Sequence, residues 1–403
     1  MNKVIIIGGG AAGYFTAINA KEKNPDLDII ILEKGKDVLQ KVKISGGGRC
    51  NVTHACFEPK ELVEFYPRGG KELLGPFHQF MTGDTFEWFD DRGVPLKIED
   101  DNRVFPEANT SQAIIDCFQK AVDNLGIKVL TNHGVNSIDQ QDNSWVVNTK
   151  QQNFEADKVV IAAGSSKKVW ELCETLDHRV VNPVPSLFTF NIKDKRLTDL
   201  LGISVPNATV KIQGTKLEAS GPLLITHWGM SGPAVLKLSA FGARILADKN
   251  YQYNIEVNWL SRPTDKILNV LLNLKKKEPR KTVSLKSPFS EISKRLWERF
   301  VTFSGIQPTQ NWADLNSRQL EDLANQLTHG YYNANGRTTF KDEFVTAGGV
   351  DLKEINFKRF ESKHHENLFF VGEVLNIDAV TGGFNFQNAW TGGYICAKAL
   401  AEK

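Results

Sequence analysis

The sequence is poor in several features that mark particular classes of protein. Its five cysteines among 403 residues form no C-x-x-C pair, so we expect neither a zinc site nor a disulfide framework. No apolar run reaches the roughly 20 residues that span a bilayer. The net charge is only +2, without the basic excess typical of nucleic-acid-binding proteins. We therefore expect a cytoplasmic protein with reduced thiols that binds neither a membrane nor a nucleic acid.

The N-terminus also lacks the long apolar stretch of a secretory signal. Val4–Ile7 is one strand long and glycines follow it directly, whereas a signal peptide needs about 7–15 apolar residues. Residues 2–7 instead predict a buried strand, residues 11–23 a helix and Ile29–Leu32 a second strand. The chain therefore begins with a strand–helix–strand unit.

The hydrophobic pattern changes several times along the chain, which is longer than the about 100–200 residues of one domain. A β-rich pattern with turn residues begins near Asn182 and continues to about residue 258, with no helix expected there. Helical periodicity follows, and α/β character returns near Thr346. We predict a first cofactor-domain segment at 1–185, a β-rich inserted domain at 186–260 and 331–345, a helical subdomain at 261–330, and a second cofactor-domain segment at 346–403.

Helices are predicted by periodicity in both parts of the chain. In the first part they cover 58–66, 71–91 and 111–125. In the second part they cover 266–277, 290–303 and 317–327. The lysine run at 275–277 is interpreted as a solvated helix end, with phosphate binding as the alternative.

A glycine motif at the first strand–helix turn predicts a dinucleotide site. Gly8, Gly10 and Gly13 fit G-x-G-x-x-G, and Glu33 follows at the end of the second strand. Gly8 makes the turn, Gly10 admits a pyrophosphate, and Gly13 lets helix and strand pack closely. The pyrophosphate then lies at the helix N-terminus. The charge of Glu33 suits two ribose hydroxyls and disfavours the 2′-phosphate of NADP at this site.

Three further segments favour FAD over NAD as the dinucleotide. Residues 41–51 form a second glycine-rich loop whose amide groups and arginine suit an anion. Residues 159–164 are a buried strand that ends in small residues. Residues 368–373 are a strand that leads into a Gly-Glu turn, and a helix is expected to begin near Gly383. Its positive end would stabilise a reduced flavin.

The same segments resemble a family of bacterial flavoproteins often called YhiN/BaiN-like. Residues 45–53 match its S-G-G-G-R-C-N-x-T signature, and residues 103–106, 226–233 and 383–385 are similar to its other marks. Residues 385–390 depart from the pattern because they are less apolar than expected. The resemblance implies non-covalent FAD and a two-dinucleotide-binding-domain, Rossmann-like α/β fold with an inserted β-barrel and a small helical subdomain. It leaves the substrate open.

The resemblance also implies positions for individual residues. Val135 is expected to pack on the adenine side, and Glu373 and Asp378 to face the ribityl or pyrophosphate region. Arg49 and Cys50 are expected near the stretch between pyrophosphate and flavin. Motifs and resemblance together predict this set of FAD-binding residues: Gly8, Gly10, Ala11, Ala12, Gly13, Glu33, Lys34, Lys41, Ser45, Gly46, Gly47, Arg49, Cys50, Val135, Ala163, Gly164, Gly372, Glu373, Asp378, Gly383, Phe384 and Asn385.

Residues that would take part in the chemistry are harder to identify. His227, in a glycine-rich turn, is the candidate acid or base, with a loop-stabilising histidine as the alternative. Arg103 and Arg337 are candidates for binding a carboxylate, or else structural ion pairs. Cys50 and Cys56 are six residues apart, so a redox-active pair on one helical face is disfavoured. His364-His365 is interpreted as part of a charged loop, and no metal site is predicted.

The predicted function is an FAD-dependent oxidoreductase that transfers a hydride between flavin N5 and a small organic substrate. Residues 165–345 contain no second G-x-G-x-x-G, so NAD(P)H is expected to dock transiently if it reduces the flavin. An amine oxidase that uses oxygen is the main alternative. A non-catalytic FAD-binding protein is another, and RNA modification is disfavoured by the low net charge.

Overall fold

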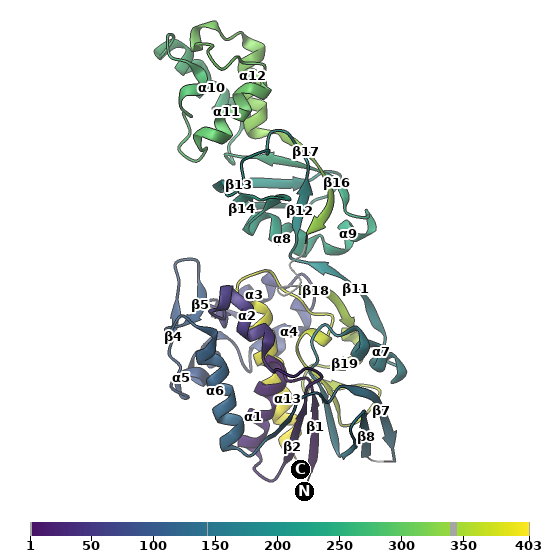
Figure 1. Cartoon of the computed structure of the whole chain (residues 1–403). Coiled ribbons are helices and arrows are strands. Elements are labelled where there is room, and N and C mark those ends of the chain that lie inside the picture. The colour runs from purple at the N-terminus through teal and green to yellow at the C-terminus, as the bar shows by residue number, and fades with distance from the viewer. Residues whose placement is uncertain (1, 143, 339–344, 403) are drawn as a thin grey trace. The chain divides into compact units, whose positions relative to one another are not determined.

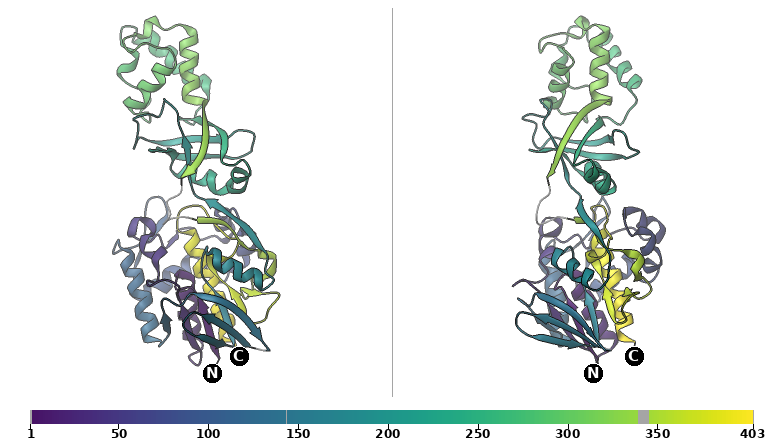
Figure 2. Two further views of the ribbon diagram at one scale, coloured as in Figure 1. Left: turned by 45° about the vertical axis from the view of Figure 1, so that its right-hand side comes forward. Right: turned by 90° about the vertical axis from the view of Figure 1, so that its right-hand side faces the viewer.

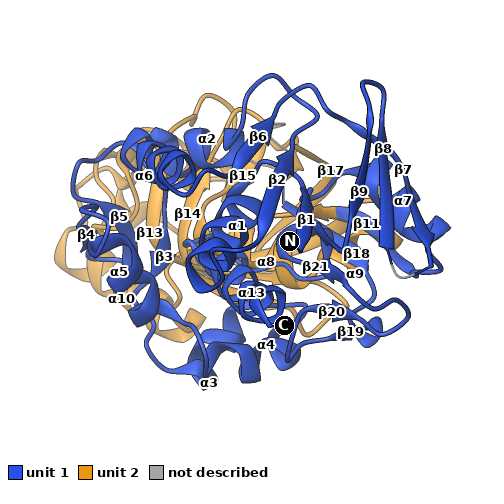
Figure 3. Ribbon diagram, turned by 90° about the horizontal axis from the view of Figure 1, so that it is seen from below, with its two compact units in different colours: residues 1–184, 341–403 blue, residues 185–340 orange. Residues whose placement is uncertain are grey.

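The computed structural model describes residues 2–142, 144–338 and 345–402, which form two compact units. Unit 1 joins both ends of the chain, Met1–Val184 and Lys341–Lys403. Unit 2 is the continuous segment Pro185–Phe340 (Figure 3).

A seven-stranded sheet forms the centre of unit 1, and its middle strands are the most apolar segments of the chain. Its order is β19-β20-β21-β10-β1-β2-β6. Strands β21, β10, β1, β2 and β6 are parallel, while β19 and β20 form an antiparallel edge. Their bounds are β1 Lys3–Ile7, β2 Asp28–Leu32, β6 Lys128–Leu130, β10 Lys158–Ile161, β19 Ile355–Asn356, β20 Glu361–Ser362 and β21 Leu368–Phe370.

Two long helices from opposite ends of the chain, α1 (Ala11–Lys23) and α13 (Phe384–Ala401), pack against each other beside this sheet (Figure 1). Their approach is close, because a β-carbon on Gly393 would lie 3.3 Å from the Phe15 ring. The rings of Phe15 and Trp390 lie 5.1 Å apart between them. This contact ties the C-terminal helix to the first strand–helix unit.

Shorter elements complete unit 1. The small sheets are β3-β5-β4, β7-β8-β9 and β11-β18. Their strands are β3 Thr53–His54, β4 Leu96–Ile98, β5 Arg103–Pro106, β7 Val135–Gln141, β8 Ser144–Thr149, β9 Asn153–Ala156, β11 Val180–Ser186 and β18 Val345–Val350. The remaining helices are α2 Gln40–Gly48, α3 Pro59–Leu62, η1 Val63–Phe65, α4 Gly70–Phe77, α5 Thr82–Asp90, α6 Ser111–Asn124, α7 Lys167–Thr175, η4 Leu352–Glu354 and η5 Gly372–Val374.

Unit 2 is a closed six-stranded barrel with the helices α10, α11 and α12 at one end and α8 and α9 toward the other (Figures 1 and 2). The barrel order is β12-β15-β14-β13-β16-β17. Its strands are β12 Thr189–Ile192, β13 Ser204–Ile212, β14 Glu218–Ile225, β15 Gly229–Ser231, β16 Gln252–Asn258 and β17 Gly330–Thr338. Its helices are α8 Pro233–Phe241, α9 Ala243–Asp248, α10 Thr264–Lys277, η2 Val283–Leu285, α11 Lys294–Phe303, η3 Trp312–Asp314 and α12 Ser317–Thr328.

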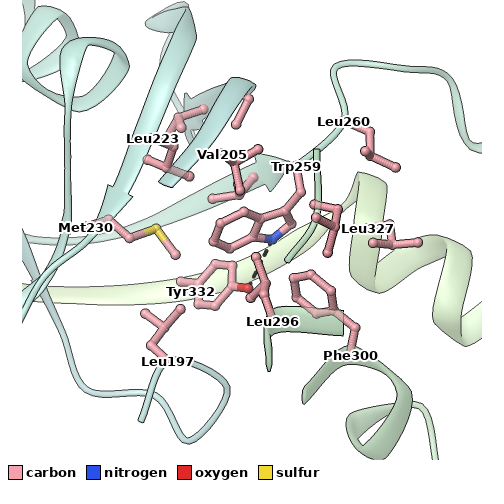
Figure 4. Close-up of a cluster of buried hydrophobic side chains, with 14 of the residues drawn as sticks. Leu197, Val205, Leu223, Met230, Trp259, Leu260, Leu296, Phe300, Leu327 and Tyr332 are labelled. Carbon is pink, nitrogen blue, oxygen red and sulfur yellow. Dashed lines mark hydrogen bonds between the residues drawn. The ribbon is translucent and has the colours of Figure 1, made fainter. Parts of the chain in front are cut away.

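One hydrophobic core runs through the barrel and its helices (Figure 4). Trp259, fully buried, donates from its indole to the hydroxyl of Tyr332 at 3.2 Å. Its ring lies 5.5 Å from that of Phe300 on α11. Met230 of the barrel and Leu296 of α11 belong to the same core. The barrel and the helices are therefore stabilised together.

The predicted fold class, a Rossmann-like FAD-binding core with an inserted barrel, is confirmed by this architecture. Two element predictions are wrong. The helix expected over 71–91 is two helices, α4 and α5. Pro76 lies in the last turn of α4, and the Asp84 carboxylate accepts the amide of Met81, the N-cap residue of α5, at 2.7 Å. Residues 233–248, within the segment expected to be β-rich, form the helices α8 and α9, and Pro233 suits the first position of α8.

Candidate functional site

The turn between β1 and α1 uses each of its glycines differently. Gly8 has a φ of +121°, and a β-carbon there would lie 2.5 Å from the carbonyl oxygen of Ala162. A β-carbon on Gly13 would collide with the carbonyl oxygen of Gly8. A β-carbon on Gly10 would meet no atom within 4 Å. Packing therefore requires Gly8 and Gly13, whereas Gly10 leaves open space at the N-terminus of α1.

Glu33 lies beside this turn and stabilises it. Its carboxylate accepts the amide of Gly9 at 2.9 Å on one oxygen and the amide of Gly35 at 2.7 Å on the other. Each carboxylate oxygen has a second lone pair, so both can still accept a hydroxyl. The side chain is thus already oriented for the ribose that the sequence motif predicts.

The second glycine loop, at the end of α2, has three successive residues in the left-handed region. The φ values are +58° at Gly46, +68° at Gly47 and +83° at Gly48. A β-carbon on Gly46 would lie 2.9 Å from the amide nitrogen of Asn51, but Gly47 and Gly48 face open space. A loop with exposed amides of this kind binds anions. The open space at Gly47 and Gly48 therefore fits the anion-binding loop that the sequence predicts.

Residues from both ends of the chain meet next to the first turn. A β-carbon on Gly372 would lie 3.0 Å from that of Ala12, and one on Gly164 would lie 3.7 Å from the Glu373 carboxylate. The same carboxylate is ion-paired with Lys41. These residues follow β21, β1 and β10, whose carboxyl ends share one edge of the sheet. In such sheets ligands bind at this edge.

Arg49 and Cys50 are held by their own neighbours. The Arg49 guanidinium lies 2.6 Å from Glu99 and 3.9 Å over the ring of Phe105. Cys50 is buried with a φ of +61°, and burial raises the pKa of its thiol to about 12. Burial also raises the pKa of Cys56. Both thiols are therefore protonated at neutral pH, which argues against a redox-active pair.

The N-terminus of α13 is built against the signature segment. Gly383 has a φ of +91°, and a β-carbon there would collide with the carbonyl oxygen of Thr53. With its amide oriented to satisfy its neighbours, Asn51 accepts the amide of Gly383 at 3.0 Å. Phe384 stacks on His54 at 4.5 Å and on Phe65 at 4.3 Å. The signature therefore also fixes where the C-terminal helix begins.

Asp378 and Asn385 hold the loop that precedes α13. The Asp378 carboxylate is fully buried and ion-paired with Arg68 through two contacts. The Asn385 side chain accepts the amide of Ala379 at 3.0 Å and donates to its carbonyl at 3.3 Å. Both side chains thus stabilise the loop in addition to the binding roles that the resemblance implies.

Two polar side chains in this region were not predicted from the sequence. The Nδ1 atom of His54 and the Oδ1 atom of Asn388 are buried with no hydrogen-bond partner. Burial lowers the pKa of His54, so its imidazole is neutral near pH 7. His54 directly follows the signature segment, a position that marks it in retrospect. Unpaired buried atoms of this kind are expected where a ligand completes the hydrogen bonds.

The other predicted residues have these surroundings. Val135 is buried at the start of β7, and Lys34 is exposed. Arg103 pairs with Asp101 at 2.7 Å. In unit 2, His227 is exposed beside Trp228, and Arg337 lies 4.5 Å over the ring of Tyr251 with its Nε atom buried and unpaired. The pair with Asp101 agrees with a structural ion-pair role for Arg103.

Taken together, these residues fit FAD. The open space over Gly10, Gly47 and Gly48 is where a β-carbon would obstruct a phosphate. Glu33 offers acceptors for a ribose, and His54 and Asn388 offer buried atoms without partners. All these groups belong to unit 1. No described helix combines the length and apolar character needed to cross a membrane.

The chain belongs to the HI0933-like family, whose Rossmann-domain model matches residues 2–399. It is 27% identical to a ribosomal RNA dihydrouridine synthase of Haemophilus influenzae, covering 99% of this chain and 98% of that protein. It is 25% identical to a 3-dehydro-bile acid delta(4,6)-reductase of Clostridium scindens, covering 100% of both. In fold it resembles a 3-ketosteroid-delta4-(5alpha)-dehydrogenase of Rhodococcus jostii, with a TM-score of 0.52, 11% identity, and 100% and 97% of the two chains covered.

The family match confirms the resemblance predicted from the signature segment. The fold, the site and the relatives define the class: this is an FAD-dependent oxidoreductase of the HI0933-like family.

Proposed function

We propose that this protein reduces a carbon–carbon double bond conjugated to a carbonyl group, with NADH or NADPH as the transient hydride donor. The observation that carries the proposal is the open space at Gly10, in the turn that Glu33 stabilises, together with that at Gly47 and Gly48, which suits FAD. When bound, FAD supplies hydride transfer at its N5 atom. The sequence shows no separate dinucleotide fingerprint for NAD(P)H, which supports a shared, transient docking place.

The named relatives support this reaction type. Dihydrouridine is uridine whose C5–C6 double bond has been reduced, and that bond is conjugated to the C4 carbonyl. A delta(4,6) 3-oxo steroid acid likewise has double bonds conjugated to a ketone. In both cases a hydride adds to a conjugated carbon, the β-carbon or, in the dienone, the δ-carbon, and a proton adds to the neighbouring carbon. This shared chemistry is what we propose for the present chain.

The chain's own residues would position the cofactor. The amides of Gly47 and Gly48 and the N-terminus of α1 are suited to hold the pyrophosphate, and Glu33 to accept ribose hydroxyls. The first amides of α13 lack helical acceptors and carry partial positive charge, so they suit an anionic group. His54, neutral by burial, can accept or donate one hydrogen bond near Phe384.

Anaerobic stopped-flow mixing tests this proposal. NADH or NADPH is expected to bleach the flavin, and an α,β-unsaturated ketone or uridine-containing RNA to restore its colour faster than oxygen does. Rapid reoxidation by oxygen with release of hydrogen peroxide, and none by unsaturated carbonyl compounds, would instead identify an oxidase. A reduced flavin that no acceptor reoxidises would indicate a non-catalytic FAD-binding protein.

The distribution of charge favours RNA uracil as the substrate over a small molecule. Unit 2 has 21 lysines and arginines against 12 aspartates and glutamates, a net charge of +9. Unit 1 has 28 against 35, a net charge of −7. The whole-chain value of +2 therefore conceals a basic unit and gives no argument against RNA. Near the end of α10, Lys276, Lys277, Arg280, Lys281 and Lys286 are all exposed, as a phosphate-binding surface requires.

RNA binding is testable with two charge-reversal variants of the full chain. Lys276→Glu combined with Lys277→Glu should weaken binding of ribosomal RNA about tenfold and reduce its salt dependence. Lys60→Glu combined with Lys120→Glu, which changes exposed residues of unit 1, should leave it unchanged. A mass gain of two hydrogens in uridine from treated RNA would identify the reaction. Equal RNA affinity in both variants would contradict RNA as the substrate and favour a small molecule.

A further inference from the structure

A cluster of three side chains in unit 1 shares no residue with the set that suits FAD. His178 follows α7, Glu354 ends η4 and His364 follows β20. The Nδ1 atom of His178 lies 3.0 Å from Oε2 of Glu354, and the Nε2 atom of His364 lies 3.7 Å from the same oxygen. All three ligand atoms lie within 4.8 Å of one another. We propose that these residues bind a divalent transition-metal ion of the zinc type.

The two separations from Glu354 are close to those of tetrahedral coordination. Zinc bonds to nitrogen and oxygen measure about 2.0–2.2 Å, which places neighbouring ligands about 3.3–3.6 Å apart. The separations of 3.0 and 3.7 Å bracket that range. Two imidazoles and one carboxylate favour zinc, cobalt or nickel over magnesium or calcium, which prefer oxygen ligands alone. Three protein ligands leave the fourth position for water.

Outer hydrogen bonds already orient two of the ligands. The second ring nitrogen of His178 lies 3.0 Å from the hydroxyl of Ser362. The amide of Arg179 donates to Glu354 Oε2 at 3.0 Å. Partners of this kind fix the tautomer and direction of metal ligands. The His178 side chain is fully buried, whereas that of His364 is 43% exposed, so an ion has a route from solvent.

The neighbouring groups set a limit on affinity. His365 lies beside the cluster but is held by Gln140 and by the carbonyl of Leu176, both at 3.0 Å, so it is not a ligand. The side chain of Lys363 donates to the carbonyl of Lys353. With a single carboxylate and with Lys363 nearby, the site is expected to bind a metal ion with moderate affinity. A bound ion would join the end of α7 to the segment around η4 and β20.

The pair His364-His365 gives no metal prediction by itself, because its partners lie far away in the sequence. The folded chain brings His178 and Glu354 to His364 from positions 186 and 10 residues earlier. The inference does not depend on the proposed substrate. It assigns the ion to unit 1, on side chains that are not among the predicted FAD-binding residues.

Cobalt absorption provides a direct test with untagged, chelator-treated, FAD-loaded full-length protein. Titration with Co²⁺ should produce the visible bands of tetrahedral cobalt at one equivalent, and Zn²⁺ should abolish them. His364→Gln should weaken Co²⁺ binding at least tenfold while leaving the FAD content unchanged. His329→Gln is the matched control, because this exposed histidine also pairs with a glutamate, Glu256, at 2.7 Å but belongs to no three-ligand group among the described residues.

Melting temperature gives a second measurement on the same variants. Zn²⁺ should raise the melting temperature of the wild type and of His329→Gln, but not that of His364→Gln. Wild-type protein without tetrahedral cobalt bands, or equal Co²⁺ affinity in His364→Gln, would overturn the proposal and leave a metal-free hydrogen-bonded cluster.

Discussion

At the scale of single residues, the glycines of the first turn separate packing from binding. Gly10 and Gly13 belong to one sequence motif, but only Gly13 is closely surrounded by protein atoms. The motif predicts both roles, yet it does not say how much free space each glycine leaves. At Gly13 that space is closed by the carbonyl oxygen of Gly8, and at Gly8 by that of Ala162, which follows β10.

Replacing these glycines one at a time distinguishes the two roles. Gly10→Ala should leave the unfolding free energy of the FAD-free protein nearly unchanged, because its methyl meets no protein atom, but should weaken FAD binding at least tenfold. Gly13→Ala should destabilise the protein by about 1–3 kcal/mol through overpacking. Urea unfolding and FAD fluorescence titration measure both effects. Unaltered FAD affinity in Gly10→Ala would remove the assigned role of Gly10.

Thiol reactivity tests the burial of Cys50. Its pKa of about 12 leaves the thiol protonated at pH 8, so dithionitrobenzoate should react with it only after unfolding. The thiol of an unfolded chain ionises near about 8.5. Raising the pH above that value therefore favours the unfolded state, and stability should fall between the two pKa values. Rapid labelling of Cys50 in the native protein, identified by mass spectrometry, would contradict this account.

At the scale of elements, the local pattern predicted some segments closely and others poorly. The helix expected over 11–23 is α1, with those bounds, because its glycine turn and flanking strands all act locally. The helix α8 was missed because its sequence is short and apolar, so periodicity does not distinguish it from the strands expected around it. The contact of Asn51 with Gly383 joins segments more than 300 residues apart, which no local pattern reports.

The ion pair of Arg68 and Asp378 is an element-level contact that sequence did not reveal. Arg68→Gln should destabilise the protein by about 3–5 kcal/mol, because it breaks the ion pair of a fully buried carboxylate. Lys167→Gln is the control, since its pair with Glu171 is exposed on both sides, and a change below about 1 kcal/mol is expected. Equal effects in urea unfolding would show that Asp378 has other adequate partners.

At the scale of the whole molecule, the chain divides into a discontinuous unit and a continuous one. Unit 2 has its own hydrophobic core from barrel to helices. Residues 185–340 expressed alone should therefore unfold cooperatively in urea and bind no FAD. An excised segment that lacks a cooperative transition would mean that unit 1 is required for its folding.

Sequence alone predicted the fold class and the cofactor because the glycine motifs that hold a dinucleotide are short and local. The charge difference between the units was missed because the prediction used only the whole-chain charge, which averages unit 1 with unit 2, although the predicted domain bounds already separate them. The His178–Glu354–His364 cluster escaped for a similar reason, since its members come together only in the folded unit.

The flavin content of the purified protein tests the central claim most directly. We predict a yellow protein that releases about one FAD per chain on heating, identified by chromatography and mass spectrometry. After removal of the flavin, the protein should take up FAD again, and Gly10→Ala should do so less tightly. A colourless protein that takes up no FAD would contradict the account of the site.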